Sequence, residues 1–153
     1  MEHSEILIRL GTKEDLPDVH KLVYELAVYE KAPEELVATV EDYHRDFEAG
    51  IFETLVAEAG GDIIGMALYY MTYSTWKGRM LYLEDFVVQE PHRRRGIGRQ
   101  LFEAFLNRAR EKECRLAKWQ VLDWNEPALD FCRKFDAAIE TNWWNGKIFF
   151  ELC

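Results

Sequence analysis

Hydrophobic residues recur along this chain with two periods, one typical of strands and the other of helices. Alternating or short apolar runs predict strands at residues 5–9, 53–59, 63–70, 79–88, 116–122 and 147–152. Apolar stripes with helical spacing predict helices over residues 16–29, from 40 up to a stop at 50, over 99–112 and through 129–135. This order of elements predicts a mixed, mostly antiparallel sheet with helices on its faces, in a single domain of the α/β or α+β class.

Capping and turn residues support these boundaries. Thr12 with Asp15, and Thr39 with Asp42, have the spacing of helix N-cap pairs. The run Gly60-Gly61-Asp62 lies between two predicted strands and is typical of a tight hairpin. The predicted strands at 53–59 and 63–70 are therefore expected to pair antiparallel.

The segment with the most chemical information joins the strand at 79–88 to the helix at 99–112. Alternation along this strand places Tyr82, Glu84, Phe86 and Val88 on one face and Leu83, Asp85 and Val87 on the other. A basic turn follows, Arg93-Arg94-Arg95-Gly96-Ile97-Gly98. Glycines let the backbone approach a ligand, and a helix N-terminus favours negative charge. The three arginines suit a diphosphate or a phosphorylated ribose, so the sequence predicts an anion site here.

Two familiar phosphate-binding loops do not fit this turn. A Walker loop ends in Gly-Lys-Ser/Thr, whereas Gly98 is followed by Arg99 and Gln100. A dinucleotide fingerprint needs a third glycine, and Phe102 occupies that place. What remains is the pattern R-x-x-G-x-G after a strand with an acidic pair. A Gly-rich turn that only caps a helix is the alternative.

Composition narrows the class of protein. With 153 residues, 48% hydrophobic and 14% aromatic, the chain is long and apolar enough to bury a core. Its net charge of −9 argues against general nucleic-acid binding and favours a small cationic substrate. We therefore expect a small-molecule partner and no nucleic acid.

Cysteine spacing and hydropathy bear on metals and location. Cys114, Cys132 and Cys153 form an odd set without C-x-x-C spacing, so neither a metal site nor a disulfide framework is indicated. No apolar run approaches the roughly 20 residues of a membrane span, and the first residues lack the apolar core of a signal peptide. The sequence predicts a cytoplasmic protein with reduced thiols and no membrane partner.

The R-x-x-G-x-G turn in this context resembles the acetyl-CoA loop of the GNAT N-acetyltransferases. Further motifs at 25–30, 73–79, 82–85 and 121–126 resemble the diamine acetyltransferase branch, which comprises the spermidine/spermine and the thialysine acetyltransferases. Y-S-T-W-K-G-R and V-L-D-W-N are more similar to the thialysine side. The resemblance covers nearly the whole chain. It implies a GNAT fold, acetyl-CoA as cosubstrate, no metal and an amine acceptor.

The resemblance also implies roles for individual residues. Glu84 matches the carboxylate that takes the proton of the amine, and its alternative is a strand carboxylate in solvent or bound to an arginine. Tyr29 and Glu30 match the positions that hold the cationic amine, or else form the polar end of a helix. Trp119 lines the acceptor pocket or belongs to the core. The residues expected to bind the cofactor are Phe86, Val87, Val88, Arg93, Arg94, Arg95, Gly96, Ile97, Gly98, Arg99, Asn125 and Ala128. Asn125 is also a plausible helix cap.

The chain departs from the family at Cys132. Relatives carry a tyrosine after the phenylalanine at this point, and that tyrosine is the proposed acid for the leaving thiolate. A cysteine thiol, with a reference pKa of roughly 8.5, can still donate a proton, although its side chain is shorter. Cys132 as a buried apolar residue is the alternative. A second departure is Asp136 in a glycine position, which predicts a left-handed or turn conformation.

These observations predict an acetyl-CoA-dependent N-acetyltransferase acting on a primary amine of a small cationic metabolite. The acceptor is a lysine-like amino acid such as thialysine, or alternatively a polyamine such as spermidine. A CoA-binding regulatory module without turnover is the hypothesis from another class, and Cys132 is the feature that points to it. The aromatic-rich end at 143–150 and the family resemblance predict a homodimer.

Overall fold

The computed structural model describes residues 5–93 and 95–150, which form two compact units that divide after Gln120. Arg94, one of the residues expected at the anion site, lies outside the described residues. The first unit contains β1 Ile6–Leu10, α1 Leu16–Tyr29, α2 Val40–Glu48, β2 Glu53–Ala59, β3 Asp62–Ser74, β4 Gly78–Val88, α3 Ile97–Glu111 and β5 Leu116–Trp119. Short 3-10 turns at Lys13–Asp15, Pro33–Glu35 and Glu90–His92 connect them. No helix in this described part is long and apolar enough to cross a membrane.

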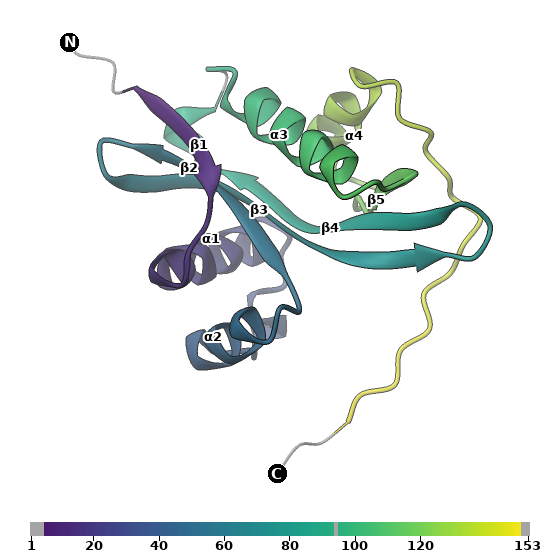
Figure 1. Cartoon of the computed structure of the whole chain (residues 1–153), viewed down its shortest axis with the longest axis horizontal. Coiled ribbons are helices and arrows are strands. Elements are labelled where there is room, and N and C mark those ends of the chain that lie inside the picture. The colour runs from purple at the N-terminus through teal and green to yellow at the C-terminus, as the bar shows by residue number, and fades with distance from the viewer. Residues whose placement is uncertain (1–4, 94, 151–153) are drawn as a thin grey trace. The chain divides into compact units, whose positions relative to one another are not determined.

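A five-stranded sheet in the order β1-β2-β3-β4-β5 forms the centre of the first unit (Figure 1). The first four strands pair antiparallel, and β5 lies parallel to β4. The predicted mixed, mostly antiparallel sheet is therefore confirmed. The predicted strand at 116–122 is too long, because β5 pairs with β4 only from Leu116 to Trp119 and regular structure ends there.

Helices cover both faces of this sheet, with α1 and α2 on one side and α3 on the other (Figure 1). Val19 and Leu22 of α1 belong to a fully buried cluster with Met66 of β3. On the opposite face, the ring of Phe105 in α3 packs edge-on against Tyr69, with centroids 5.5 Å apart. The two faces of the sheet therefore have separate cores.

A polar cluster fixes α3 on the sheet. Glu53 at the start of β2 accepts bonds from Arg108 Nη2 in α3 at 2.9 Å and from Nζ of Lys112, the residue after α3, at 2.8 Å. The Tyr69 hydroxyl donates to the same carboxylate at 3.1 Å. Glu53 therefore joins the C-terminal end of α3 to the sheet.

The capping and turn signals are confirmed. Thr39 Oγ1 accepts a bond from Asp42 N at 3.1 Å, and Asp42 Oδ2 accepts a bond from Thr39 N at 2.9 Å. Asp15 accepts from Thr12 N in the same way at 2.8 Å. At the β2–β3 turn, Gly60 and Gly61 have positive φ angles of 57° and 87°. Glycine accepts this conformation without steric cost, which is why the hairpin forms there.

The second unit, residues 121–150, contains one helix, α4 Glu126–Arg133. Asp136, which follows this helix, adopts the predicted left-handed conformation with φ 54°. The predicted strand at 147–152 is wrong for residues 147–150, which form no regular structure, and 151–152 lie outside the described residues. A strand requires a partner for its backbone groups, and hydrophobicity alone does not supply one.

Candidate active site

A β-bulge in β4 determines where the acidic pair points. Leu68 of β3 lies opposite Asp85, but the next residue, Tyr69, lies opposite Leu83, so Glu84 is the extra residue. A bulge breaks the alternation of side chains and re-aims those beside it. The prediction that Glu84 and Asp85 occupy opposite faces is therefore wrong, because it assumed an unbroken period of two.

Both carboxylates lie on the face of the sheet that α1 and α2 cover. Asp85 is paired with Leu68, which belongs to the core beneath α1. Glu84 Oε1 accepts a hydrogen bond from the hydroxyl of Tyr70, two residues beyond Leu68 on β3, at 2.6 Å. Phe86, predicted on the same face as Glu84, instead packs against Phe102 of α3, with ring centroids 5.8 Å apart. The bulge thus gathers two negative charges on one face.

The environment of these carboxylates favours a bound cation. Asp85 is half-buried, and burial together with repulsion from Glu84 and Glu30 raises its pKa to about 7. Burial also raises the pKa of Glu30, which follows the last residue of α1. An added positive charge would relieve the repulsion among the three groups. The first unit therefore contains an acidic cluster, Glu30, Glu84 and Asp85, that suits an ammonium group.

Tyrosine side chains surround the acidic cluster. Burial and the negative charges of Asp85 and Glu84 raise the pKa of Tyr43, on α2, to about 12. Burial and then Glu84 raise the pKa of Tyr70 and Tyr82, whose rings lie 5.5 Å apart. These hydroxyls keep their protons at neutral pH and remain hydrogen-bond donors.

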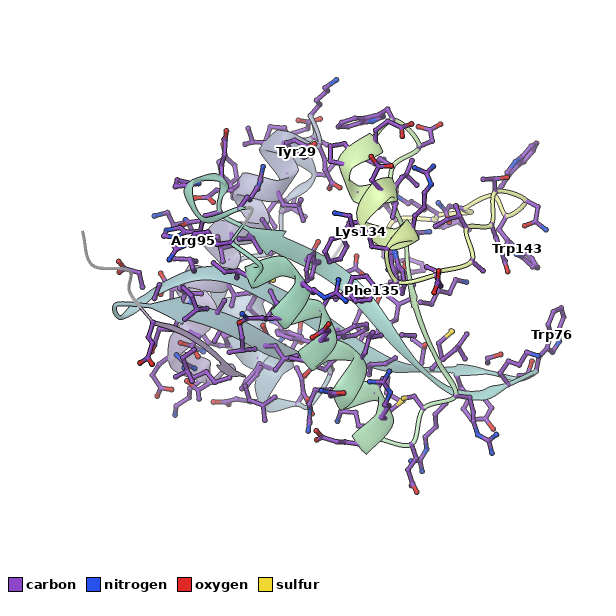
Figure 2. The ribbon with its side chains drawn as sticks, turned by 90° about the horizontal axis from the view of Figure 1, so that it is seen from above. Tyr29, Trp76, Arg95, Lys134, Phe135 and Trp143 are labelled. Atoms are coloured by element: carbon purple, nitrogen blue, oxygen red, sulfur yellow. The ribbon has the colours of Figure 1, made fainter. Side chains whose placement is uncertain are left out.

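The turn before α3 has the features of the predicted anion site. Gly96 adopts a left-handed conformation with φ 77°, and a Cβ added there would meet nothing within 4 Å. The first bond of α3 runs from Gln100 N to Gly96 O at 3.1 Å, and the N–H groups of a first helical turn have no acceptor within the helix. Arg95 is exposed on the loop that enters α3 (Figure 2). The turn thus presents helix dipole, open backbone and positive charge together.

Arg93, also expected at the anion site, is directed elsewhere. Its Nε donates to the carbonyl of Val88, the last residue of β4, at 2.9 Å. Its guanidinium lies over the ring of Tyr29, 5.9 Å from the centroid. Arg93 therefore links the end of β4 to the end of α1 and brings the anion turn close to Tyr29.

β5 covers the second edge of β4 only in part. Its parallel pairing with β4 runs from Met80 to Leu83, and in the described residues no strand pairs with that edge from Glu84 to Val88. The main chain of Phe86, Val87 and Val88 lies on this stretch, and the carbonyl of Val88 accepts the bond from Arg93. The contact of these three residues with a pantetheine arm stays a prediction.

Trp119 does not join the acidic cluster. It lies on β5 with its ring edge-on to Phe102 of α3, with centroids 5.3 Å apart. This contact is on the face opposite to the carboxylates. Trp119 therefore packs as a residue of the core would, and its role in binding the acceptor stays a prediction.

Ile97, Gly98 and Arg99 lie in the first turn of α3, whereas Asn125, Ala128 and Cys132 belong to the second unit. Asn125 Oδ1 accepts a bond from Ala128 N at 3.3 Å, so Asn125 caps α4. Cys132, on the same helix, is buried. The cap agrees with one of the two roles considered for Asn125. The cofactor roles of Asn125 and Ala128, and the acid role of Cys132, stay predictions.

The sequence patterns do not indicate Asp85, Tyr43 and Tyr70 as site residues. Alternation places Asp85 opposite Glu84, because nothing in a single sequence marks a bulge between two carboxylates. Tyr43 lay on a predicted helix as part of its apolar stripe, and Tyr70 ended a predicted strand. The clustering of tyrosines with carboxylates depends on strand register, which only the folded chain reveals.

Comparison with known proteins shows which protein family the chain belongs to. The Acetyltransferase (GNAT) family matches residues 16–137, and the chain belongs to this family. It is therefore an acetyltransferase, which confirms the predicted class of enzyme. The family uses acetyl-CoA.

Individual relatives have more specific names than the family. Thialysine N-epsilon-acetyltransferase of Bos taurus is 34% identical over 142 residues, which cover 86% of this chain and 84% of the relative. The human spermidine/spermine N(1)-acetyltransferase-like protein 1 is 30% identical over 148 residues, which cover 89% of this chain and 21% of the relative. An aminoglycoside acetyltransferase from a soil metagenomic sample, solved in complex with sisomicin, has the same fold with a TM-score of 0.79. It is 20% identical, and the match covers 95% of this chain and 97% of that one.

Proposed function

We propose that this protein transfers the acetyl group of acetyl-CoA to a primary amine of a small cationic metabolite. The observation that carries the proposal is the acidic cluster, in which Glu84 and Glu30 lie close enough to Asp85 to raise the pKa of that carboxyl. Three clustered carboxylates suit a substrate with more than one positive charge. Relatives named as thialysine and spermidine/spermine acetyltransferases support the same class of acceptor.

The residues around the anion turn fit acetyl-CoA. Its diphosphate matches the open backbone at Gly96, the start of α3 and the exposed Arg95. The main chain of Phe86, Val87 and Val88, proposed to contact its pantetheine arm, lies on the stretch of β4 that β5 does not cover. Acetyl-CoA supplies the acetyl group as an activated thioester. Asn125 and Ala128 of the second unit are proposed as further contacts.

The chain's own residues provide for the amine. An ammonium group must lose a proton before its nitrogen can attack, and Glu84 is the proposed acceptor of that proton, directly or through water. Asp85 and Glu30 compensate the positive charge of the acceptor, and the exposed ring of Tyr29 offers an aromatic face. In this scheme Glu84 acts as the base while its two neighbours hold the substrate.

Cys132 is proposed as the residue that takes the place of the family's tyrosine, with two outcomes open. Its thiol either protonates the leaving thiolate or serves only as a buried apolar residue. A thiolate is a tolerable leaving group, so turnover does not require an acid at this position. We favour a thiolate that leaves without help from the enzyme.

We further propose that the protein acts as a cytoplasmic homodimer. The hydrophobic side chains near the C-terminus are exposed in the single chain, with Trp144 at 96%, Ile148 at 84% and Phe150 at 84%. Exposed aromatic and aliphatic groups of this density are suitable for a buried interface between copies.

The proposal is tested by the release of free CoA thiol from acetyl-CoA in the presence of thialysine, lysine, spermidine and an amino-terminal peptide. We expect turnover with the lysine analogue, and turnover with spermidine if the alternative acceptor is correct. Saturable binding of acetyl-CoA, without release of CoA thiol in the presence of any of these amines, would instead favour a regulatory module.

A further inference from the structure

Tyr70 is held against the proposed base from a neighbouring strand. Its hydroxyl lies 2.6 Å from Glu84 Oε1, at the short end of the range for hydrogen bonds to a charged oxygen. Its ring lies 5.5 Å from that of Tyr82, with the ring planes 30° apart. Tyr70 is half-buried on β3, where the cross-strand pairing with Tyr82 fixes its position.

The hydroxyl of Tyr70 is a permanent donor to Glu84. Burial, and then the carboxylate of Glu84, raise the pKa of Tyr70 above its usual range. Among the described residues, Tyr70 is the one that donates a hydrogen bond to Glu84. The bond occupies one of the two carboxylate oxygens.

We propose that Tyr70 is a positioning residue for acetyl transfer, fixing one oxygen of Glu84 so that the other faces the amine. The inference rests on the proposed function, because it assumes that Glu84 accepts the amine proton. When the acceptor ammonium loses its proton, the N–H bond breaks and an O–H bond forms on the free oxygen of Glu84. The proton later passes to water and regenerates the carboxylate.

The test is the Tyr70→Phe variant, followed by CoA-thiol release at pH 7 with thialysine or spermidine, whichever turns over faster. We expect kcat to fall about tenfold while KM for the amine stays near that of the parent, because the variant keeps the carboxylate of Glu84 and loses only the bond that orients it.

Tyr69→Phe is the matched control. Tyr69 is the preceding residue on β3, and its hydroxyl also donates to a glutamate, Glu53, but on the opposite face of the sheet. We expect this variant to keep the kcat of the parent. An unchanged kcat in Tyr70→Phe, or an equal fall of kcat in Tyr69→Phe, would overturn the inference.

Glu84→Gln separates this inference from the proposed function. If Glu84→Gln retains full turnover, the proposed base is wrong, and the role of Tyr70 falls with it. If Glu84→Gln loses turnover while Tyr70→Phe keeps the kcat of the parent, only the role of Tyr70 is wrong. When both matter, Tyr70→Phe should have little further effect in a Glu84→Gln background, because the two residues act as one unit.

Discussion

Replacing Asp85 with asparagine should stabilise the folded protein at pH 8 and have much less effect at pH 4.5. Burial and the charges of Glu84 and Glu30 raise the pKa of Asp85 to about 7, against roughly 3.9 in an unfolded chain. The folded state therefore binds the proton more tightly. From about pH 4 to pH 7, the free energy of unfolding of the parent falls as the pH rises.

The two pKa values set the size of the effect. A difference of about three pH units, at about 1.4 kcal/mol for each, gives an upper limit of about 4 kcal/mol. Because part of this effect is already present at pH 4.5, and because Asp85 is half-buried and retains some solvent, we expect the advantage of Asp85→Asn to grow by about 2–3 kcal/mol between pH 4.5 and pH 8. A gain in stability at the expense of substrate binding is typical of groups placed for function.

Urea unfolding at pH 4.5, 6, 7 and 8 measures this difference for parent and variant. Asp62→Asn is a suitable control, because it removes the same charge from an exposed position on the β2–β3 hairpin and should show no such trend. A stability difference for Asp85→Asn that stays constant over the four pH values would refute the reasoning. It would mean that Asp85 is as well solvated in the folded state as in the unfolded one.

Three further predictions concern cofactor binding, packing and assembly. Acetyl-CoA should raise the melting temperature, and Arg95→Ala should reduce that rise without unfolding the protein; equal affinity in parent and variant would contradict the anion turn. Glu53→Ala should lower the free energy of unfolding by about 1–3 kcal/mol, because it leaves Arg108, Lys112 and Tyr69 without their shared acceptor. Glu103→Ala, which removes an exposed ion pair, should lower it by under about 1 kcal/mol, and equal losses for the two variants in urea unfolding would refute this. Light scattering at micromolar concentration should give the mass of a dimer, and a monomer would remove that proposal.

Much of the fold could be predicted from sequence because its signals are local. The N-cap pair at Thr39, the glycines of the β2–β3 turn and the apolar stripe of α3 each depend on neighbouring residues alone. The C-terminal strand was wrong for the opposite reason. Apolar residues at 147–150 suit a strand, but a strand also needs a partner edge, and the local pattern does not provide one.

The site could be predicted only in part. Glu84 and the turn at Gly96 were recognised because motif and resemblance indicate them directly. Asp85 and Tyr70 were missed, because their roles depend on a one-residue shift in the register of two strands. A period of two is a good guide to the faces of a strand until a bulge interrupts it, and a bulge between two carboxylates leaves no mark in composition or spacing.

The most direct test of the central claim is the rate of CoA-thiol release by Glu84→Gln compared with Cys132→Ala, using the best acceptor amine. General acid–base groups contribute about 10²–10⁴-fold, so the two variants are easily distinguished. If Glu84 is the base and the thiolate leaves without an enzymic acid, Glu84→Gln loses rate on that scale, and Cys132→Ala stays near the parent. Full activity in folded Glu84→Gln would contradict the account, and an equally large loss in folded Cys132→Ala would show that the thiol is the working acid.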